Sequence, residues 1–253
     1  MNLKKTLENV LANRLITTVF QPVIHIETGR IIGYEALSRG PEGPLQEPLV
    51  LFSLATEFGY AMKLEQLCLA SAMENSISMP TNLRLFINLS PFAVENGILD
   101  VFDHELTELT VIEITEAGVI NDYSKVKKVI DFYRRRGIKI AVDDVGNGYD
   151  RLRSIAELEP DWIKIDRGLI QGCYENKGRR RVLKHLVALA AELKAKVVAE
   201  GIEKVDELNI AGVIGIHYAQ GFYLGKPQSK PWENLMCAGD NSHLSPYLVS
   251  KCF

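Results

Sequence analysis

Two adjacent aspartates, Asp143 and Asp144, follow an apolar run and precede a glycine-rich turn. The run at residues 138–142 predicts a short buried strand, and Gly146 and Gly148 favour a chain reversal because glycine adopts positive φ without strain. We therefore expect both carboxylates at the end of a strand, beside a loop. An isolated aspartate pair is more often solvated or caps a helix, so the rest of the chain decides whether this pair is functional.

Further polar residues occur at or near the ends of other predicted strands, and they are Glu35, Asn88, Glu113, Lys164, Asp166, Glu200 and Gln220. Any one of them could simply be satisfied by backbone amides. If they converge, the carboxylates raise one another's pKa unless cations lie between them. Carboxylate and amide oxygens favour Mg²⁺ or Mn²⁺ over zinc, which prefers cysteine and histidine. An aspartate shared between two such ions suits the in-line displacement of a phosphate ester by water.

The elements that position these residues begin with two strand-like runs at residues 17–26 and 30–37. Only residues 27–29 separate them, which is too short for a parallel crossover, so we expect an antiparallel hairpin. Helical spacing of apolar residues then covers residues 49–78, with a break near Phe58 and Gly59.

From residue 83 onward, predicted strands and helices alternate. The strands cover residues 83–89, 110–115, 138–142, 162–165, 196–199 and 216–219, and the helices cover residues 94–109, 123–136, 152–158, 178–194 and 205–211. Eight strands with helices between nearly all of them indicate an α/β fold, a (β/α)₈ TIM-like barrel with one antiparallel strand near the N-terminus. The active sites of such barrels lie at the C-terminal ends of the strands, so we expect the polar residues to lie together at that end. An open doubly wound sheet is the alternative, but it lacks support from any glycine-rich dinucleotide fingerprint.

Length and composition fit one domain over residues 1–253, with the motifs at 21–227 and a C-terminal helix and tail at 229–253. The formal charge of −3 and a pI near 6.0 give no reason to expect a nucleic acid polymer as partner. We expect no membrane span, and four cysteines without paired spacing suit the cytoplasm. The basic clusters at 134–136 and 179–181 are expected to be solvated, and the five histidines to be structural or superficial.

Seven motifs follow one another along the chain. They are Tyr-Glu-Ala-Leu-Ser-Arg-Gly at 34–40, Ile-Asn-Leu-Ser-Pro at 87–91, Glu-Ile-Thr-Glu at 113–116, Asp-Asp-Val-Gly-Asn-Gly-Tyr at 143–149, Ile-Lys-Ile-Asp at 163–166, Ala-Glu-Gly-Ile-Glu at 199–203 and Gln-Gly-Phe at 220–222. Together they resemble the EAL-domain cyclic di-GMP phosphodiesterases. Glu-Ala-Leu alone would mean nothing, whereas an ordered set of seven makes a chance match implausible.

The resemblance implies a barrel with one antiparallel strand, as the hairpin already suggests. It also implies a phosphodiesterase that hydrolyses cyclic di-GMP to linear pGpG with two Mg²⁺ or Mn²⁺ ions per active site. The implied metal ligands are Glu35, Asn88, Glu113, Asp143, Asp144 and Glu200, with Asp143 serving both ions. Glu200 resembles a family residue that acts as a metal ligand or general base.

Other implied roles concern water, substrate and the loops. Lys164 resembles the lysine that holds the attacking water, and Gln220 a further partner of the water or metals, so that Lys164, Glu200 and Gln220 form the implied catalytic set. The implied substrate contacts are Gln21, Leu37, Arg39 and Asp166. Glu116 resembles the glutamate that anchors the loop after Asp144, and Glu203 is expected to support Glu200. We also expect a homodimer.

The loop after the aspartates departs from the family pattern. Val145, Asn147 and Asp150 replace the usual phenylalanine, threonine and serine, which leaves the ligand residues intact but puts less side chain at position 145 to hold the loop. Two functions therefore compete: an active phosphodiesterase, and a non-hydrolysing cyclic di-GMP receptor or protein-interaction domain. The complete set of acids favours the enzyme, and another metal-dependent phosphoesterase is a weaker third possibility.

Overall fold

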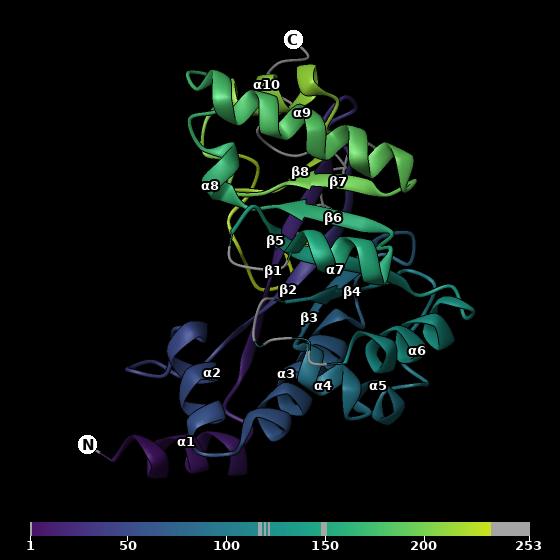
Figure 1. The fold of residues 1–253 in the computed structure, drawn as a ribbon. Helices are drawn as coiled ribbons and strands as arrows, with labels where there is room; N and C mark the ends of the chain where they lie inside the picture. The colour runs from purple at the N-terminus through teal and green to yellow at the C-terminus, as the bar shows by residue number, and fades with distance from the viewer. Residues whose placement is uncertain (1, 116–117, 119, 121, 148–150, 234–253) are drawn as a thin grey trace.

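The computed structural model describes residues 2–115, 118, 120, 122–147 and 151–233, and within them eight strands close into a barrel in chain order (Figure 1). The strands are β1 (Thr17–His25), β2 (Ile31–Arg39), β3 (Arg84–Leu89), β4 (Thr110–Ile114), β5 (Lys139–Val145), β6 (Trp162–Ile165), β7 (Lys196–Ala199) and β8 (Tyr218–Ala219). The predicted (β/α)₈ TIM-like barrel is confirmed.

The first strand runs against its neighbours. β1 pairs antiparallel with both β2 and β8, and all other neighbouring strands pair in parallel, so the predicted hairpin is confirmed. Gln21 on β1 lies opposite Glu35 on β2. Because β1 is reversed, a residue in its first half reaches the end of the barrel where the parallel strands finish.

Helices follow most strands on the outside of the barrel, as α7 and α9 do beside β5–β7 in Figure 1. They are α1 (Leu3–Ala12), α2 (Pro48–Glu57), α3 (Ala61–Ser76), α4 (Pro91–Glu95), α5 (Ile98–Val101), α6 (Tyr123–Arg134), α7 (Arg151–Leu158), α8 (Arg167–Ile170), α9 (Lys177–Glu192) and α10 (Val205–Ile214). No helix among the described residues has the length and apolar character that a membrane span requires.

Apart from shifts at the ends of elements, the structure differs from the sequence-based elements in three places. The helix expected at 94–109 is replaced by α4 and α5, which are separated by Gly97 at φ +80°. The short α8, capped by Asp166, was not predicted. Of the C-terminal helix and tail expected at 229–253, residues 229–233 are described, and the rest lies outside the described residues together with Cys237 and Cys252.

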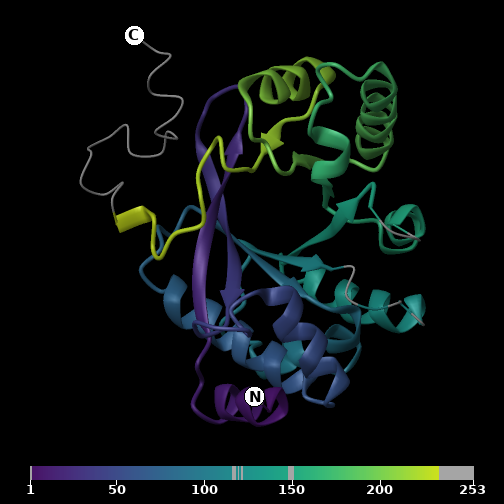
Figure 2. The same ribbon diagram turned by 90° about the vertical axis from the view of Figure 1, so that its left-hand side faces the viewer.

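Two apolar layers hold the barrel. The larger core lies between the strands and the surrounding helices, whereas a smaller cluster consists of Val23, Phe86, Val111, Ala141, Trp162 and Val198, one residue from each of six strands. Trp162 is buried among Phe86 and Tyr218, as expected for a core residue. A satellite core joins α1 to α2 and α3, and Figure 2 shows α1 at the foot of the molecule.

Candidate active site

The polar residues of the site lie one layer above the inner apolar cluster. Side chains two apart on a strand share a face, so the residue two positions beyond each inward apolar residue also faces the barrel interior. The pairs are Phe86 and Asn88, Val111 and Glu113, Ala141 and Asp143, Trp162 and Lys164, and Val198 and Glu200. On the reversed β1 the same rule runs backwards, from Val23 to Gln21. A two-residue period therefore gathers acids and amides at one end of the barrel.

Lys164 lies at the centre of four carboxylates. Its Nζ is 3.1 Å from Glu35 Oε2, 2.9 Å from Glu113 Oε1, 3.4 Å from Asp143 Oδ1 and 2.8 Å from Glu200 Oε1. The Lys164 side chain is 1% exposed and that of Glu113 is fully buried. One ammonium cannot neutralise four ionised carboxylates, so full ionisation of the cluster would leave excess negative charge where water screens it poorly.

The pKa values of these groups follow from burial and mutual charge. Burial first, and then neighbouring carboxylates, raise the pKa of Glu113 and of Glu200 well above the usual range, and burial also raises the pKa of Asp143 despite the Lys164 charge. Burial opposes ionisation of Glu35 too, but Lys164 and hydrogen bonds from amides outweigh it and lower the pKa of Glu35. For Lys164, burial is outweighed by the four acids, which raise its pKa. Lys164 and Glu35 thus favour their charged forms, while Glu113, Glu200 and Asp143 hold a proton to higher pH than usual when no further cation is present.

Three amide side chains complete the polar layer. Asn88 Nδ2 donates to Glu35 Oε1 at 2.6 Å, and Gln220 Nε2 donates to Glu35 Oε2 at 2.6 Å and to Gln21 Oε1 at 3.0 Å. Gln21 in turn donates to the carbonyl of Gly225 at 2.9 Å. These bonds fix the orientation of Glu35 from both sides.

Several oxygens in the cluster are suited to a hard cation. Glu113 Oε1, Asp143 Oδ1 and Gln220 Oε1 are buried and accept no hydrogen bond, although the first two lie within ion-pair distance of Lys164. Asp143, Asp144 and Glu200 each offer one carboxylate oxygen, and these three oxygens lie within 4.8 Å of one another. An all-oxygen donor set with buried, unsatisfied acceptors fits Mg²⁺ or Mn²⁺.

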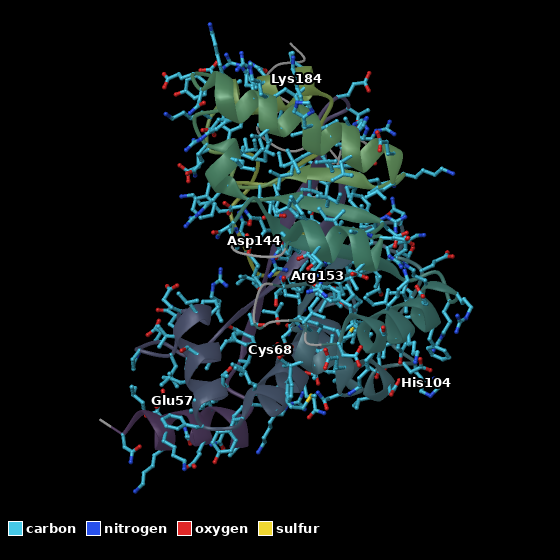
Figure 3. All side chains as sticks on the ribbon, viewed as in Figure 1. Glu57, Cys68, His104, Asp144, Arg153 and Lys184 are labelled. Carbon is cyan, nitrogen blue, oxygen red and sulfur yellow. The ribbon has the colours of Figure 1, made fainter. Side chains whose placement is uncertain are left out.

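The two aspartates lie at the end of a strand, as expected, but β5 continues to Val145 and so includes both of them, whereas the predicted strand ended at residue 142. The β5–β6 register shifts between Val142 and Val145, and Asp144 has a φ of +54°. Adjacent strand residues normally face opposite sides, and a bulge changes the direction of a side chain. This irregularity lets Asp144 line the cavity beside Asp143. Figure 3 shows Asp144 on the α8 side of the barrel, far from His104 and Lys184.

Val145 and Asn147, the departures from the family pattern, have distinct surroundings. Val145 is 1% exposed, pairs with Ile165 and accepts a hydrogen bond from the Asp166 amide at 3.0 Å. Asn147 lines the cavity, and its amide donates to the Asp144 carbonyl at 3.1 Å. The valine therefore fills a core position. Asp150 and the anchoring residue Glu116 lie outside the described residues.

A cavity of about 410 Å³ opens above the acidic layer. Of the predicted site residues it is lined by Gln21, Glu35, Asp144, Asp166, Glu200, Glu203 and Gln220. Arg167 and Phe222, which the sequence reasoning did not assign, also line it. Asp166 additionally caps α8, since its side chain accepts from the Gly168 amide at 2.8 Å.

A second cavity of about 150 Å³ lies between the end of β2 and helices α2 and α3, and it holds the other predicted substrate contacts, Leu37 and Arg39. Arg39 donates to the Ser38 carbonyl at 2.8 Å. Glu65 lines this cavity but was missed, although a charged residue on the apolar face of α3 was the available signal. Glu65 accepts hydrogen bonds from the Ser90 amide at 2.9 Å and from Ser90 Oγ at 2.5 Å, and burial raises its pKa.

The histidines and the basic clusters at 134–136 and 179–181 were expected to lie outside the site. No histidine of the described residues lines either cavity. The basic clusters are not simply solvated, however, because several of their guanidinium groups bind backbone carbonyls. Arg134 donates to the Leu158 carbonyl at 2.9 Å, and Arg180 donates to the Cys173 carbonyl at 2.8 Å. These arginines join neighbouring loops, which a charge count cannot reveal.

Comparison with known proteins agrees with this geometry. The family model of the EAL domain matches residues 4–227. The chain belongs to the EAL domain family. The EAL chain is 32% identical over 224 residues to a cyclic di-GMP phosphodiesterase of Pseudomonas aeruginosa, and the match covers 83% of this chain and 38% of that protein.

Solved EAL structures agree with the fold. The PaMucR phosphodiesterase in complex with c-di-GMP has a TM-score of 0.81 at 26% identity, and the match covers 93% of this chain and 100% of that one. Klebsiella pneumoniae BlrP1 with calcium and c-di-GMP has a TM-score of 0.75 at 26% identity, with 85% and 56% covered, and BlrP1 has also been solved with manganese. The chain spans 28–47% of the length of the curated relatives compared with it.

Proposed function

We propose that this EAL domain is a metal-dependent phosphodiesterase that hydrolyses cyclic di-GMP to linear pGpG. The observation that carries the proposal is the cluster of four carboxylates, three of them buried, around Lys164, which opens into a cavity and retains acceptors without hydrogen bonds. Such a cluster is costly to bury, since its acids must either take up protons or repel one another. Divalent cations would remove that cost, and phosphate ester hydrolysis is chemistry that they support.

The proposed ligands lie on four strands and directly after a fifth, β7, at one end of the barrel. They are Glu35, Asn88, Glu113, Asp143, Asp144 and Glu200, which would hold two Mg²⁺ or Mn²⁺ ions with Asp143 shared between them. When bound, the ions would lower the pKa of water and stabilise negative charge on the phosphate oxygens. The amides of Asn88 and Gln220 hold Glu35 in place through bonds of 2.6 Å.

Side chains of the protein would accept the proton of water and hold the water in place. Water attacks phosphorus, the bond from phosphorus to the 3′ oxygen breaks, the 3′ oxygen takes up a proton to become a hydroxyl, and the product keeps the phosphate on its 5′ oxygen. We assign Glu200 as the base that accepts the proton of water, since it lines the cavity and one of its carboxylate oxygens lies within 4.8 Å of oxygens of Asp143 and Asp144. We assign Lys164 to hold the attacking water, with Gln220 as a further partner of the water. Lys164 can donate three hydrogen bonds from a position that no bulk solvent reaches.

Substrate contacts are proposed on both cavities. Gln21 and Asp166 line the larger cavity, while Leu37 and Arg39 line the smaller one. An arginine fork can bind a phosphate through two hydrogen bonds, so Arg39 is assigned to a phosphate of the dinucleotide. Glu65 and Phe222 are added to the surfaces that the substrate would meet.

A non-hydrolysing cyclic di-GMP receptor is the second candidate function, and one observation favours it. Lys164 already contacts all four acids, so its charge partly replaces that of metal ions and lets the cavity hold an anionic ligand without turnover. In both cases we propose a single domain over residues 1–253, acting in the cytoplasm as a homodimer, which sedimentation would test.

The two functions separate in one experiment. The protein is incubated with cyclic di-GMP and either Mn²⁺, Mg²⁺ or EDTA, and products are resolved by chromatography while binding is followed by calorimetry. The enzyme predicts pGpG with either metal and none with EDTA. Binding with no pGpG under any condition would support the receptor, and neither binding nor turnover would contradict both.

A further inference from the structure

The loop between β7 and α10, residues 200–204, carries two residues of the larger cavity, Glu200 and Glu203. Glu207, which the proposed reaction does not use, lies beneath this loop on the first turn of α10 and is 2% exposed. A carboxylate at that depth requires partners for both oxygens. The identity of those partners connects Glu207 to the cavity.

Two of the bonds to Glu207 are local. Its Oε2 accepts from the amides of Glu203 at 2.9 Å and Lys204 at 3.0 Å, which otherwise would lack partners at the start of α10. A glutamate at the third helical position commonly makes such a bond. These contacts alone would give Glu207 a role only in capping its own helix.

The third bond reaches a distant part of the chain. Glu207 Oε1 accepts from the amide of Gly172 at 3.0 Å, across 35 positions of sequence. Gly172 adopts a φ of +68° in the turn after α8. Glu207 therefore holds the loop that carries Glu203 against the segment that links β6 to α9.

A second contact joins the same two segments at the cavity. Gln171, next to Gly172, donates from Nε2 to Glu203 Oε1 at 3.0 Å. Its own backbone carbonyl accepts a hydrogen bond from Arg179. Fixing the amide of Gly172 also fixes the peptide that carries Gln171, so Glu207 constrains both Glu203 and the residue that binds the Glu203 carboxylate.

The rest of the loop is held by other elements. The amide of Glu200 donates to the Ile165 carbonyl at 3.1 Å, and the amide of Ile202 donates to the Gln220 carbonyl at 3.0 Å. These bonds secure Glu200 and the middle of the loop without Glu207. Glu203, which is exposed at the cavity rim, is held by Glu207 through its amide and by Gln171 through its carboxylate.

We propose that Glu207 and Gln171 are positioning residues for Glu203, and that they set the affinity of the cavity for its dinucleotide substrate without taking part in the chemical step. The assignment rests on the proposed function for its kinetic readout. It predicts that the two residues act only through the Glu203 carboxylate. A role in general stability would instead act whether or not that carboxylate is present.

The test combines Glu207→Gln and Gln171→Leu with Glu203→Ala. In Glu207→Gln, the remaining oxygen can keep the local cap, while the new amide group faces the Gly172 amide and cannot accept its hydrogen bond. Each variant should raise the KM for cyclic di-GMP by about 3- to 10-fold with kcat within about twofold, the size expected for one hydrogen bond. In the Glu203→Ala background, neither change should raise KM further.

Asp206→Asn is the matched control, since Asp206 is exposed on the same turn and loses the same charge. It should leave KM and kcat unchanged. An unchanged KM in Glu207→Gln and Gln171→Leu, or an equal rise in KM with and without the Glu203 carboxylate, would overturn the proposal.

Amide hydrogen exchange separates this proposal from the proposed function, because it needs no substrate. Glu207→Gln should speed exchange at residues 171–172 and 203–204 by about tenfold or more, while residues 196–200 keep the wild-type rate. Exchange unchanged at 171–172 would refute the positioning role even in a protein without turnover. If exchange is faster but the protein neither binds nor hydrolyses cyclic di-GMP, the positioning of Glu203 would be supported and the proposed function would be contradicted.

Discussion

The two ends of the barrel interior carry opposite charges. At the end where the parallel strands finish, Glu35, Glu113, Asp143 and Glu200 surround Lys164. At the other end, β3, β5 and β7 begin with cations, which are Arg84, Lys139 and Lys196. Each cation lies two residues before an inward apolar residue, and Glu113, Asp143 and Glu200 each lie two residues after one, whereas Glu35 follows Gly33 by two. The same two-residue period thus produces two charged layers on either side of an apolar one.

Solvent access makes the two layers energetically different. Lys139 pairs with Asp161 at 3.2 Å and remains 42% exposed, and Lys196 is exposed while its Nζ lies 4.8 Å from the Trp162 ring centroid. Burial and then the charges of Arg84 and Lys139 lower the pKa of Lys196, but water still reaches it. Of the acids at the opposite end, Glu35, Glu113 and Asp143 are buried, and Glu113 and Asp143 each have an oxygen with no hydrogen bond. Unbalanced charge costs little in water and much in the interior, so the buried layer is the one that indicates function.

The largest expected effect comes from removing an acid of the buried layer. Glu35→Ala should abolish turnover, a loss on the order of 10³-fold or more, because a proposed metal ligand and the partner of three side chains disappear together. Glu35→Gln keeps the size of the side chain and should lose as much, whereas Lys139→Gln at the other end should keep wild-type activity. Production of pGpG measures all three, and full activity in either Glu35 variant would contradict the assignment.

Removing the central cation should have the next largest effect. Lys164→Ala should lower kcat by about 10²-fold or more while most binding of cyclic di-GMP is kept, since the proposed water-holding group is lost. The metal-free protein should also lose several kcal/mol, roughly 3–5 if the acids stay charged and less if they take up protons. Steady-state kinetics and chemical unfolding would measure these changes. A loss of substrate affinity with kcat unchanged would count against the role of Lys164.

The effect of metal on stability should depend on pH in a definite direction. Burial raises the pKa of Glu113, Glu200 and Asp143 in the metal-free fold, so these groups bind more protons when folded than when unfolded. Their contribution to stability is therefore present below the unfolded pKa and is lost as pH rises through the folded pKa. Metal would replace those protons, so the gain in Tm from Mn²⁺ should be larger at pH 8 than at pH 6. Thermal unfolding with and without Mn²⁺ checks this, and an equal or smaller gain at pH 8 would contradict it.

The smallest effect is expected at the solvent-exposed end. Lys196→Gln removes the cation over Trp162 and should lower the free energy of unfolding by about 0.5–1 kcal/mol, with kcat and KM unchanged. Chemical denaturation would detect this change. A loss of activity in Lys196→Gln comparable to that of the Glu35 variants would remove the distinction between the two ends.

The polar residues at the strand ends could be predicted because the sequence features that reveal them are local. The hairpin followed from the three-residue connection, and the inward layer followed from polar residues in apolar runs. The bulge that directs Asp144 to the cavity could not, because it depends on the pairing of Val145 with Ile165 on another strand.

The partners of buried glutamates on helices could not be predicted from the sequence either. Glu65 accepts a hydrogen bond from the Ser90 amide and Glu207 accepts one from the Gly172 amide, and in each case the partner lies outside the helix that carries the glutamate. A charged residue on an apolar helix face signals that some partner exists but does not identify it. The sequence placed Val145 in the loop after the aspartates, whereas the valine occupies a buried position in β5.

The central claim is that the buried acids support metal-dependent hydrolysis. Protein freed of metal by EDTA and dialysis is incubated with cyclic di-GMP in ¹⁸O-labelled water, before and after addition of Mn²⁺, and the product is analysed by mass spectrometry. We predict no product before addition and, after it, pGpG that carries one ¹⁸O atom in its 5′ phosphate. Cyclic di-GMP that remains intact after Mn²⁺ is added, or pGpG formed equally well without metal, would contradict the account.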